Sequence, residues 1–185
     1  MNYQRKLVLI FFLNFIILFS CEDNSKILNE INFELQEPVG IANQIKMIYT
    51  DSTEIKAILT APKHLDYTNL SFQYSIFPKG LKVDFFDELG NKNEAISDYG
   101  ILYNSTKILD LKGNVILKSY NGSELITNQL FWDIEKEWLF TEKFFTFQDS
   151  SYDFQAYRLD TNKEFTKFQT GELVGKIIVN DSIDK

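Results

Sequence analysis

The stretch NVILKSYNGSELITNQLFW, residues 114–132, carries the clearest fold signal in the chain. Val115 and Leu117 occupy alternate positions, which is the two-residue period of a β-strand. Asn121-Gly122 follows them, and a second run of the same type comes next. An Asn-Gly pair between two such runs is the strongest short hairpin signal in a sequence. The stretch therefore predicts two antiparallel strands joined by a turn.

Runs with the same period continue on both sides of this hairpin. They cover residues 45–50, 55–61, 81–85, 115–118, 123–132, 137–147, 152–159, 164–169 and 173–179. Short strands separated by turn residues at this spacing are typical of an all-β sandwich, jelly roll or barrel. We find no helical pattern long enough for a βαβ unit. The sequence predicts one all-β domain over 45–179, followed by a tail at 180–185.

A weak internal similarity relates residues 93–113, 123–143 and 151–171. Each segment reaches an aromatic or aliphatic residue before Asn or Asp, and then turns through charged residues into another strand. Repeats at this spacing suggest stacked antiparallel hairpins that bury their apolar sides against one another. An ordinary antiparallel meander would give the same pattern, so both interpretations stay open.

The first twenty residues differ from the rest of the chain. Arg5 and Lys6 precede an apolar run, 7–19, and no acidic residue occurs before Glu22. A charged start followed by a short apolar run is typical of a secretory signal peptide. The alternative is an uncleaved membrane helix, but the run is shorter than the roughly 20 residues that span a bilayer. We therefore predict a signal peptide over residues 1–20.

Leu18-Phe19-Ser20-Cys21 resembles the bacterial lipobox, although Phe19 is bulkier than the usual residue at its position. In that motif the Cys thiol is alkylated with diacylglycerol and the Cys becomes the new N-terminus. Cys21 is also the only cysteine, so an intramolecular disulfide is impossible. The resemblance implies a lipid anchor on Cys21 that holds the protein on an envelope membrane.

Residues 21–44 are predicted to be the lipidated N-terminus and a polar tether. Their apolar residues have helix-like spacing and allow at most one short helix, which would end near Pro38 and Gly40. The chain has a net charge of −7, which argues against binding nucleic acid. Its 17 Phe and 9 Tyr side chains supply a core and argue against disorder.

No catalytic or metal-binding motif is recognisable. His64 is the single histidine, and we expect it in a surface turn. One His and one Cys cannot build a typical zinc site, so we predict neither a metal nor a cofactor. Lys79-Gly80 and Lys112-Gly113 are interpreted as turns that enter strands, not phosphate-binding loops. A hydrolase would need two carboxylates that converge in a cleft, and we predict that the protein is not an enzyme.

The apolar residues that share one strand face are candidates for a groove that accepts acyl chains, although each of them could equally belong to a packed core. A slip of one residue would reverse the face. The candidates are Leu59, Leu81, Val83, Phe85, Val115, Leu117, Leu125, Trp132 and Phe140.

Three stretches lie in order within residues 45–147. They are IYTDSTEIKAILTAPKHLDY (48–67), FPKGLKVDFFDELGN (77–91) and LFWDIEKEWLFTEKFF (130–145). Together they resemble the lipopolysaccharide-export family LptC in its lipoprotein-anchored, Bacteroidetes-like form. Residues 148–185 depart from the family pattern, because the glycine-rich hairpin expected after the last Phe strand is missing from 152–159.

The resemblance implies a twisted, open β-jelly roll of antiparallel strands whose interior carries the acyl chains of lipopolysaccharide or lipooligosaccharide. It further implies a periplasmic location, anchored to the inner membrane in preference to the outer. The partners would be the inner-membrane ABC transporter subunits and an LptA-like bridge protein, paired edge to edge. The alternative function is an envelope lipoprotein that binds glycans or scaffolds a complex.

Overall fold

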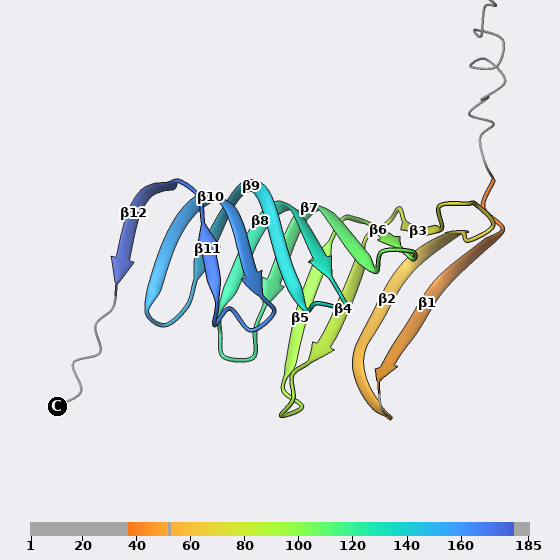
Figure 1. Cartoon of the computed structure of the whole chain (residues 1–185), viewed down its shortest axis with the longest axis horizontal. Coiled ribbons are helices and arrows are strands. Elements are labelled where there is room, and N and C mark those ends of the chain that lie inside the picture. The colour runs from red at the N-terminus through yellow and green to blue at the C-terminus, as the bar shows by residue number, and fades with distance from the viewer. Residues whose placement is uncertain (1–36, 52, 180–185) are drawn as a thin grey trace, which may run out of the picture. The chain divides into compact units, whose positions relative to one another are not determined.

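The computed structural model describes residues 37–51 and 53–179, which contain strands and turns and no helix. The predicted signal peptide, Cys21, most of the predicted tether and the tail lie outside these residues. The strands, all antiparallel, are β1 (Gly40–Asp51), β2 (Glu54–Tyr67), β3 (Tyr74–Phe77), β4 (Leu81–Phe86), β5 (Lys92–Ser97), β6 (Tyr99–Tyr103), β7 (Ile108–Lys118), β8 (Glu124–Asp133), β9 (Trp138–Gln148), β10 (Tyr152–Asn162), β11 (Phe168–Thr170) and β12 (Leu173–Val179) (Figure 1). The predicted all-β class is confirmed.

The hairpin predicted at Asn121-Gly122 joins β7 to β8. The Gly122 amide donates to the Ser119 carbonyl at 3.0 Å, and the Ser119 amide donates to the Ser123 carbonyl at 2.8 Å. Gly122 has φ +91°, a conformation that glycine adopts without steric cost. The Asn121-Gly122 pair therefore forms the hairpin turn that the sequence predicts.

Strand β1 begins at Gly40, five residues before the predicted start of the domain. The Val39 amide donates to the Asp66 carbonyl at 2.8 Å, and Gly40 pairs with Asp66 across the ladder. Pro38 and Gly40 therefore mark the entry to a strand, and the short helix predicted before them lies outside the described residues. Because β1 is an edge strand with many exposed side chains, its first residues lack the alternation by which a strand is recognised.

The long strands bend and contribute to two layers. The first half of β7 pairs with β6, from Ile108 to Lys112, whereas its second half pairs with β5, from Ile116 to Lys118. Between the halves the ladder with β8 shifts, and Gly113 and Asn114 have positive φ angles of 73° and 44°. Lys112-Gly113 is therefore a bulge in the middle of a strand, and its interpretation as a strand-entry turn was wrong. Bulges of this type bend a strand.

Strand β2 bends in the same way, because Ala57–Thr60 pair with β4 whereas Leu65–Tyr67 pair with β3. The pairings β2–β4–β5–β7–β6–β3–β2 therefore close into a ring. Beyond the ring, β8, β9 and β10 extend both layers as a meander, and β11 and β12 pair with different halves of β10.

The two layers meet along a bent side and separate along an open side. The bends lie along the top of the view in Figure 1, and the hairpin turns hang toward the bottom. The first layer ends there in turns 87–91, 119–123 and 149–151. The second layer ends there in turns 104–107 and 134–137 and in the loop 163–167. The buried side chains lie between the layers, and the space between these two rows of turns is where the interior can open.

Candidate functional site

A groove of about 600 Å³ opens between the two rows of turns. Its apolar wall in the first layer includes Ala57, Leu59, Val83 and Phe85. The facing wall in the second layer is formed by Leu102, Leu109, Trp132 and Ile134. The β1 residues Met47, Ile48 and Tyr49 line one end of the groove. A concave, mostly apolar space with few polar groups is the common form of a small-ligand site.

Eight of the nine predicted groove residues are buried on the inner face of the layers. The structure brings four of them together in the wall of the groove, namely Leu59, Val83, Phe85 and Trp132. Val115, Leu117 and Leu125 are fully buried in the core outside the groove, and Leu81 lines a different hollow on the bent side.

Phe140 is placed on the other face. It pairs across the ladder with Phe131, and the two rings stack with centroids 5.1 Å apart. The neighbouring Leu139 is the buried residue that faces the interior. Trp138, Leu139 and Phe140 are all apolar, so alternation alone could not decide which of them points inward.

A contact between two aromatic rings in the groove wall joins the two layers. The rings of Phe85 and Trp132 lie 4.8 Å apart between centroids and are tilted by 59°. Phe85 comes from β4 and Trp132 from β8, so this contact holds the layers together below the open side. The Trp132 indole nitrogen is buried and has no hydrogen-bond partner among the residues that the structure describes.

Charged side chains of both signs border the mouth of the groove. Asp51 and Lys56 stand on the first-layer side, and Lys107, Glu135, Glu137 and Lys163 stand on the second-layer side. The Lys163 ammonium is almost fully buried and pairs with Glu137 at 2.5 Å. The pKa of Lys56 is raised, first because its ammonium donates to Glu54 and to a smaller degree by the charges of Asp51 and Glu137.

Past Lys163, the space between the layers is filled by phenylalanine. Phe147 and Phe154 come from the first-layer halves of β9 and β10, whereas Phe165 lies in the loop 163–167 and Phe168 starts β11. Phe147 contacts Phe154 at 5.4 Å and Phe165 at 5.3 Å between ring centroids. These four rings form one cluster, which we call the phenylalanine plug.

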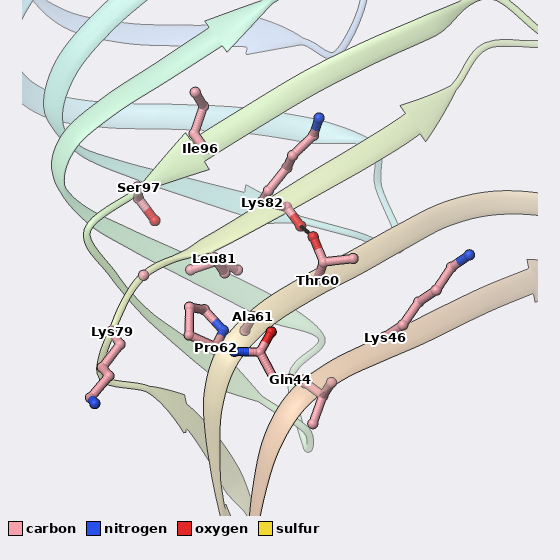
Figure 2. A pocket seen from close by; sticks show the side chains of 12 residues that line it. Gln44, Lys46, Thr60, Ala61, Pro62, Lys79, Leu81, Lys82, Ile96 and Ser97 are labelled. Carbon is pink, nitrogen blue, oxygen red and sulfur yellow. Dashed lines mark hydrogen bonds between the residues drawn. The ribbon is translucent and has the colours of Figure 1, made fainter.

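A second hollow of about 570 Å³ lies on the bent side, where β2 leaves β4 (Figure 2). Lys46, Lys79 and Lys82 surround it, but Figure 2 shows their ammonium groups pointing in different directions. Lys82 is also paired with Asp84 at 3.3 Å and with Glu94 at 2.5 Å. The hollow is wide open and lacks a convergent set of donors.

His64 is not a surface turn residue, and that expectation was wrong. It lies in β2, is half-buried, and stacks on Phe77 with ring centroids 5.3 Å apart. The sequence Ala61-Pro62-Lys63 resembles a turn. In the structure it is the part of β2 that lies between the residues paired with β4 and those paired with β3. Proline has no backbone N–H to donate, and at this position no hydrogen bond to β3 or β4 is lost. Among the described residues, no group of three or more His, Cys, Asp or Glu could hold a metal ion.

The chain was compared with known proteins on this basis. Over residues 37–51 and 53–179, no helix is long and apolar enough to cross a membrane. A search of curated proteins found no match. A family model described as lipopolysaccharide-assembly, LptC-related, matches residues 7–169, which include the groove and the plug. Because this match covers most of the 185 residues, the chain belongs to the LptC-related family of lipopolysaccharide-assembly proteins.

Proposed function

We propose that the chain is a periplasmic bridge component that accepts lipopolysaccharide or lipooligosaccharide and holds its acyl chains in the groove between the layers. The family acts in lipopolysaccharide transport in the cell envelope, and it is a family of transport proteins rather than enzymes. The observation that carries the proposal for this chain is the open, apolar groove beside Phe85 and Trp132.

The energetics of the groove suit an acyl chain. Each methylene group that leaves water contributes about 0.8 kcal/mol, so a chain gains from any long apolar wall. The open side lets the sugar and phosphate groups of a glycolipid stay in water while its chains are buried. Charged residues occur at the mouth and not in the walls, which matches this division.

Transfer to partners would use the free strand edges. Within the described residues β1 pairs only with β2, and β12 pairs only with β10. Unpaired edges of this type accept a strand from another chain. We propose that one end docks to the inner-membrane ABC transporter and the other to an LptA-like bridge protein. Energy for movement would come from the ATPase of the transporter.

Membrane attachment through lipid on Cys21 is part of the same proposal, with the inner membrane as the anchor site. Cys21→Ser should leave an uncleaved precursor and abolish incorporation of a palmitate label. Precursor size on a gel and radiolabelled palmitate measure the two effects. Normal labelling of the variant would contradict the anchor.

Photo-crosslinking from Phe85 tests the groove. With azidophenylalanine at position 85 in the full chain, illumination of living cells should capture lipopolysaccharide. The matched control is azidophenylalanine at Tyr157, which is exposed, packs against Phe144 on the outer face and should capture none. A folded protein that never captures lipopolysaccharide from position 85 would leave the glycan-binding or scaffold lipoprotein as the better account.

Phe85→Asp tests whether the groove is used. Burying an unpaired carboxylate against acyl chains costs several kcal/mol, whereas an empty groove can admit water to the charge. We expect the variant protein to accumulate while lipopolysaccharide builds up at the inner membrane. Loss of the protein itself would instead indicate that Phe85 belongs to a closed core.

A further inference from the structure

The outer face of the second layer is apolar at the end of the domain that begins with β1. In β3, Ser75 and Phe77 are buried toward the interior, so Tyr74 and Ile76, which alternate with them, face outward. Residues directly opposite one another on antiparallel strands share a face of the sheet. The ladder partners of Tyr74 and Ile76 therefore identify the other members of this outer surface.

Two neighbouring rows of side chains cross three strands on this face, and every member is aliphatic or a tyrosine. The six members are Leu65 and Tyr67 on β2, Tyr74 and Ile76 on β3, and Ile101 and Tyr103 on β6. The rings of Tyr67 and Tyr74 stack with their centroids 4.8 Å apart. Ile108 on β7 pairs with Tyr103 and continues the tyrosine row. We call the surface made by the six residues the tyrosine face.

The rim of the tyrosine face is the most exposed part of it. Val39 and Ile41 are each 61% exposed, and Ile41 on β1 pairs with Leu65. Phe72, between β2 and β3, is 51% exposed, and its ring centroid lies 5.7 Å from that of Tyr103. Figure 1 shows β1, β2, β3 and β6 together at one end of the domain. Apolar side chains that gather on an exposed surface mark a contact with a protein or a membrane.

The outer face of the first layer has a different composition. It carries Lys82, Asp84, Lys92 and Glu94, and these side chains form ion pairs, with Lys82 at 2.5 Å from Glu94 and Lys92 at 3.3 Å from Asp84. Charged and polar residues are the usual covering of a sheet face that meets water. None of the six residues of the tyrosine face is charged. Contact with water alone therefore does not account for its composition.

The place where the chain enters the domain indicates what covers the face. The described residues begin at Glu37, two residues before Val39, and the predicted lipid anchor on Cys21 lies 16 residues before Glu37. Sixteen residues span at most about 55 Å when fully extended, so this end of the domain stays near the membrane surface. The alternative for the N-terminus, a membrane helix over 7–19, gives nearly the same limit.

We propose that the tyrosine face, with Val39, Ile41 and Phe72 at its rim, lies on the surface of the membrane to which the chain is anchored. The inference rests on the membrane attachment in the proposed function and goes beyond it, because a lipid anchor alone does not orient the folded domain. Tyrosine suits this position, since its ring is apolar while its hydroxyl bonds to water or headgroups. The net charge of −7 favours an apolar contact over an electrostatic one.

The contact leaves the groove and the free edge of β1 accessible. Side chains of the outer face stand perpendicular to the sheet, whereas the unpaired backbone groups of β1 lie in the plane of the sheet. Tyr103 is followed by the turn 104–107, and Lys107 at the end of this turn borders the mouth of the groove. A membrane on the tyrosine face therefore lies beside the mouth, which shortens the path of a glycolipid from the bilayer into the groove.

Photo-crosslinking to phospholipid tests the contact. Full-length protein is purified from its membranes and reconstituted into vesicles of phosphatidylethanolamine and phosphatidylglycerol that contain a fluorescent phosphatidylethanolamine. Azidophenylalanine replaces Tyr74 in the tyrosine face or, as the matched control, Tyr157, which is exposed on the outer face of β10. Protein that floats with the vesicles is illuminated. Position 74 should capture several-fold more phospholipid than position 157.

A charge in the tyrosine face should weaken the contact. Ile76→Lys should lower phospholipid capture at position 74 several-fold, because a charged side chain resists transfer out of water. Ile116→Lys is the matched control, since Ile116 lies between two fully buried neighbours in β7 and faces outward on the first layer. It should leave capture unchanged. Capture should also persist at high salt, because an apolar contact is not screened.

The outcomes separate this inference from the proposed function. Capture at 74 that falls with Ile76→Lys and not with Ile116→Lys supports the membrane contact. Floating protein that captures no more phospholipid at 74 than at 157 would overturn it and leave the anchor intact. Protein that does not float would overturn the anchor and the membrane contact together. Capture of a protein in place of phospholipid from position 74 in living cells would make the face a protein interface and overturn the membrane contact. Capture of lipopolysaccharide from position 85 tests the groove independently of all of these.

Discussion

The groove and the phenylalanine plug have the same architecture and differ in how they are filled. Both lie between the same two layers, and both are bounded by hairpin turns on the open side. In the groove the first-layer wall includes the small residues Ala57 and Val83, whereas the plug brings several phenylalanine rings together. The interior is therefore open where short side chains lie beside the rings of the wall, and filled where phenylalanine rings meet.

The largest expected difference in the free energy of unfolding is between removing a ring that packs against the plug and removing a ring from the groove wall. Phe145 is fully buried and packs edge-on against Phe154, so Phe145→Ala should lower the free energy of unfolding by about 3–5 kcal/mol. Phe85→Ala removes a ring that has the open groove on one side, where contacts are already missing, and it should cost roughly half as much. Urea unfolding of the purified full-length variants measures both values.

Equal losses for these two substitutions would mean that the groove closes in solution. Phe144→Ala, on the outer face, controls for the loss of aromatic surface. It should stay within about 0.5 kcal/mol of the original chain, as surface substitutions usually do.

Replacing one alanine by leucine in each region should give a smaller difference in stability, because this change adds side-chain volume instead of removing it. Ala156 is fully buried beside the plug, so Ala156→Leu should overpack the core and cost about 1–3 kcal/mol. Ala57 lines the groove, where the extra carbon atoms find empty space, so Ala57→Leu should leave the free energy of unfolding nearly unchanged. The same Ala57→Leu protein should capture less lipopolysaccharide at position 85. Destabilisation by both leucines would contradict an open groove.

The smallest effect is a pH dependence at the groove mouth. The pKa of Asp133 is lowered, first because the Lys136 ammonium donates to it at 2.8 Å and further by the Lys136 amide at 2.9 Å. A carboxylate whose pKa is lower in the folded state adds stability above its unfolded pKa, near 3.9. That stability is lost as the pH falls below about 4.

Asp133→Asn should remove this dependence. Because Lys136 is 80% exposed, solvent screens the ion pair and the effect should be about 1 kcal/mol or less. Unfolding by urea at pH 3 and pH 6 measures it, and hydrogen exchange of the 134–137 turn locates it. A pH dependence that persists in the Asn variant would assign the effect to other carboxylates.

The sequence predicted the strand class well because alternation and turn residues are local signals. The hairpin at Asn121-Gly122 needs nothing beyond its own residues. The bends could not be predicted in this way, because Gly113 and Asn114 look like an ordinary turn in the sequence. Only the pairing shows a bend, since β7 pairs with β6 before these residues and with β5 after them. Likewise His64 comes two residues after Pro62, and only the pairing of β2 shows that His64 lies in a strand.

Part of the groove wall could be placed from the sequence, because alternation along a strand is a local signal. Leu59, Val83 and Phe85 follow a clear alternation and line the groove. Phe140 lies in a run that is apolar in both phases, so its face depends on the register with β8. The sequence also gave no sign of the plug, because Phe165 lies in a loop and reaches Phe147 only through the folding of the second layer over the first.

The repeated bend has a consequence for evolution by insertion and deletion. Strands β7, β8 and β9 each pair with the next strand on both sides of their bend, so each of these strands contributes to both layers of the sandwich. Adding or losing one hairpin changes the depth of the fold by two strand spacings, roughly 10 Å, and leaves every other cross-section intact. The length of the fold can therefore change in steps of one hairpin while its cross-section stays the same.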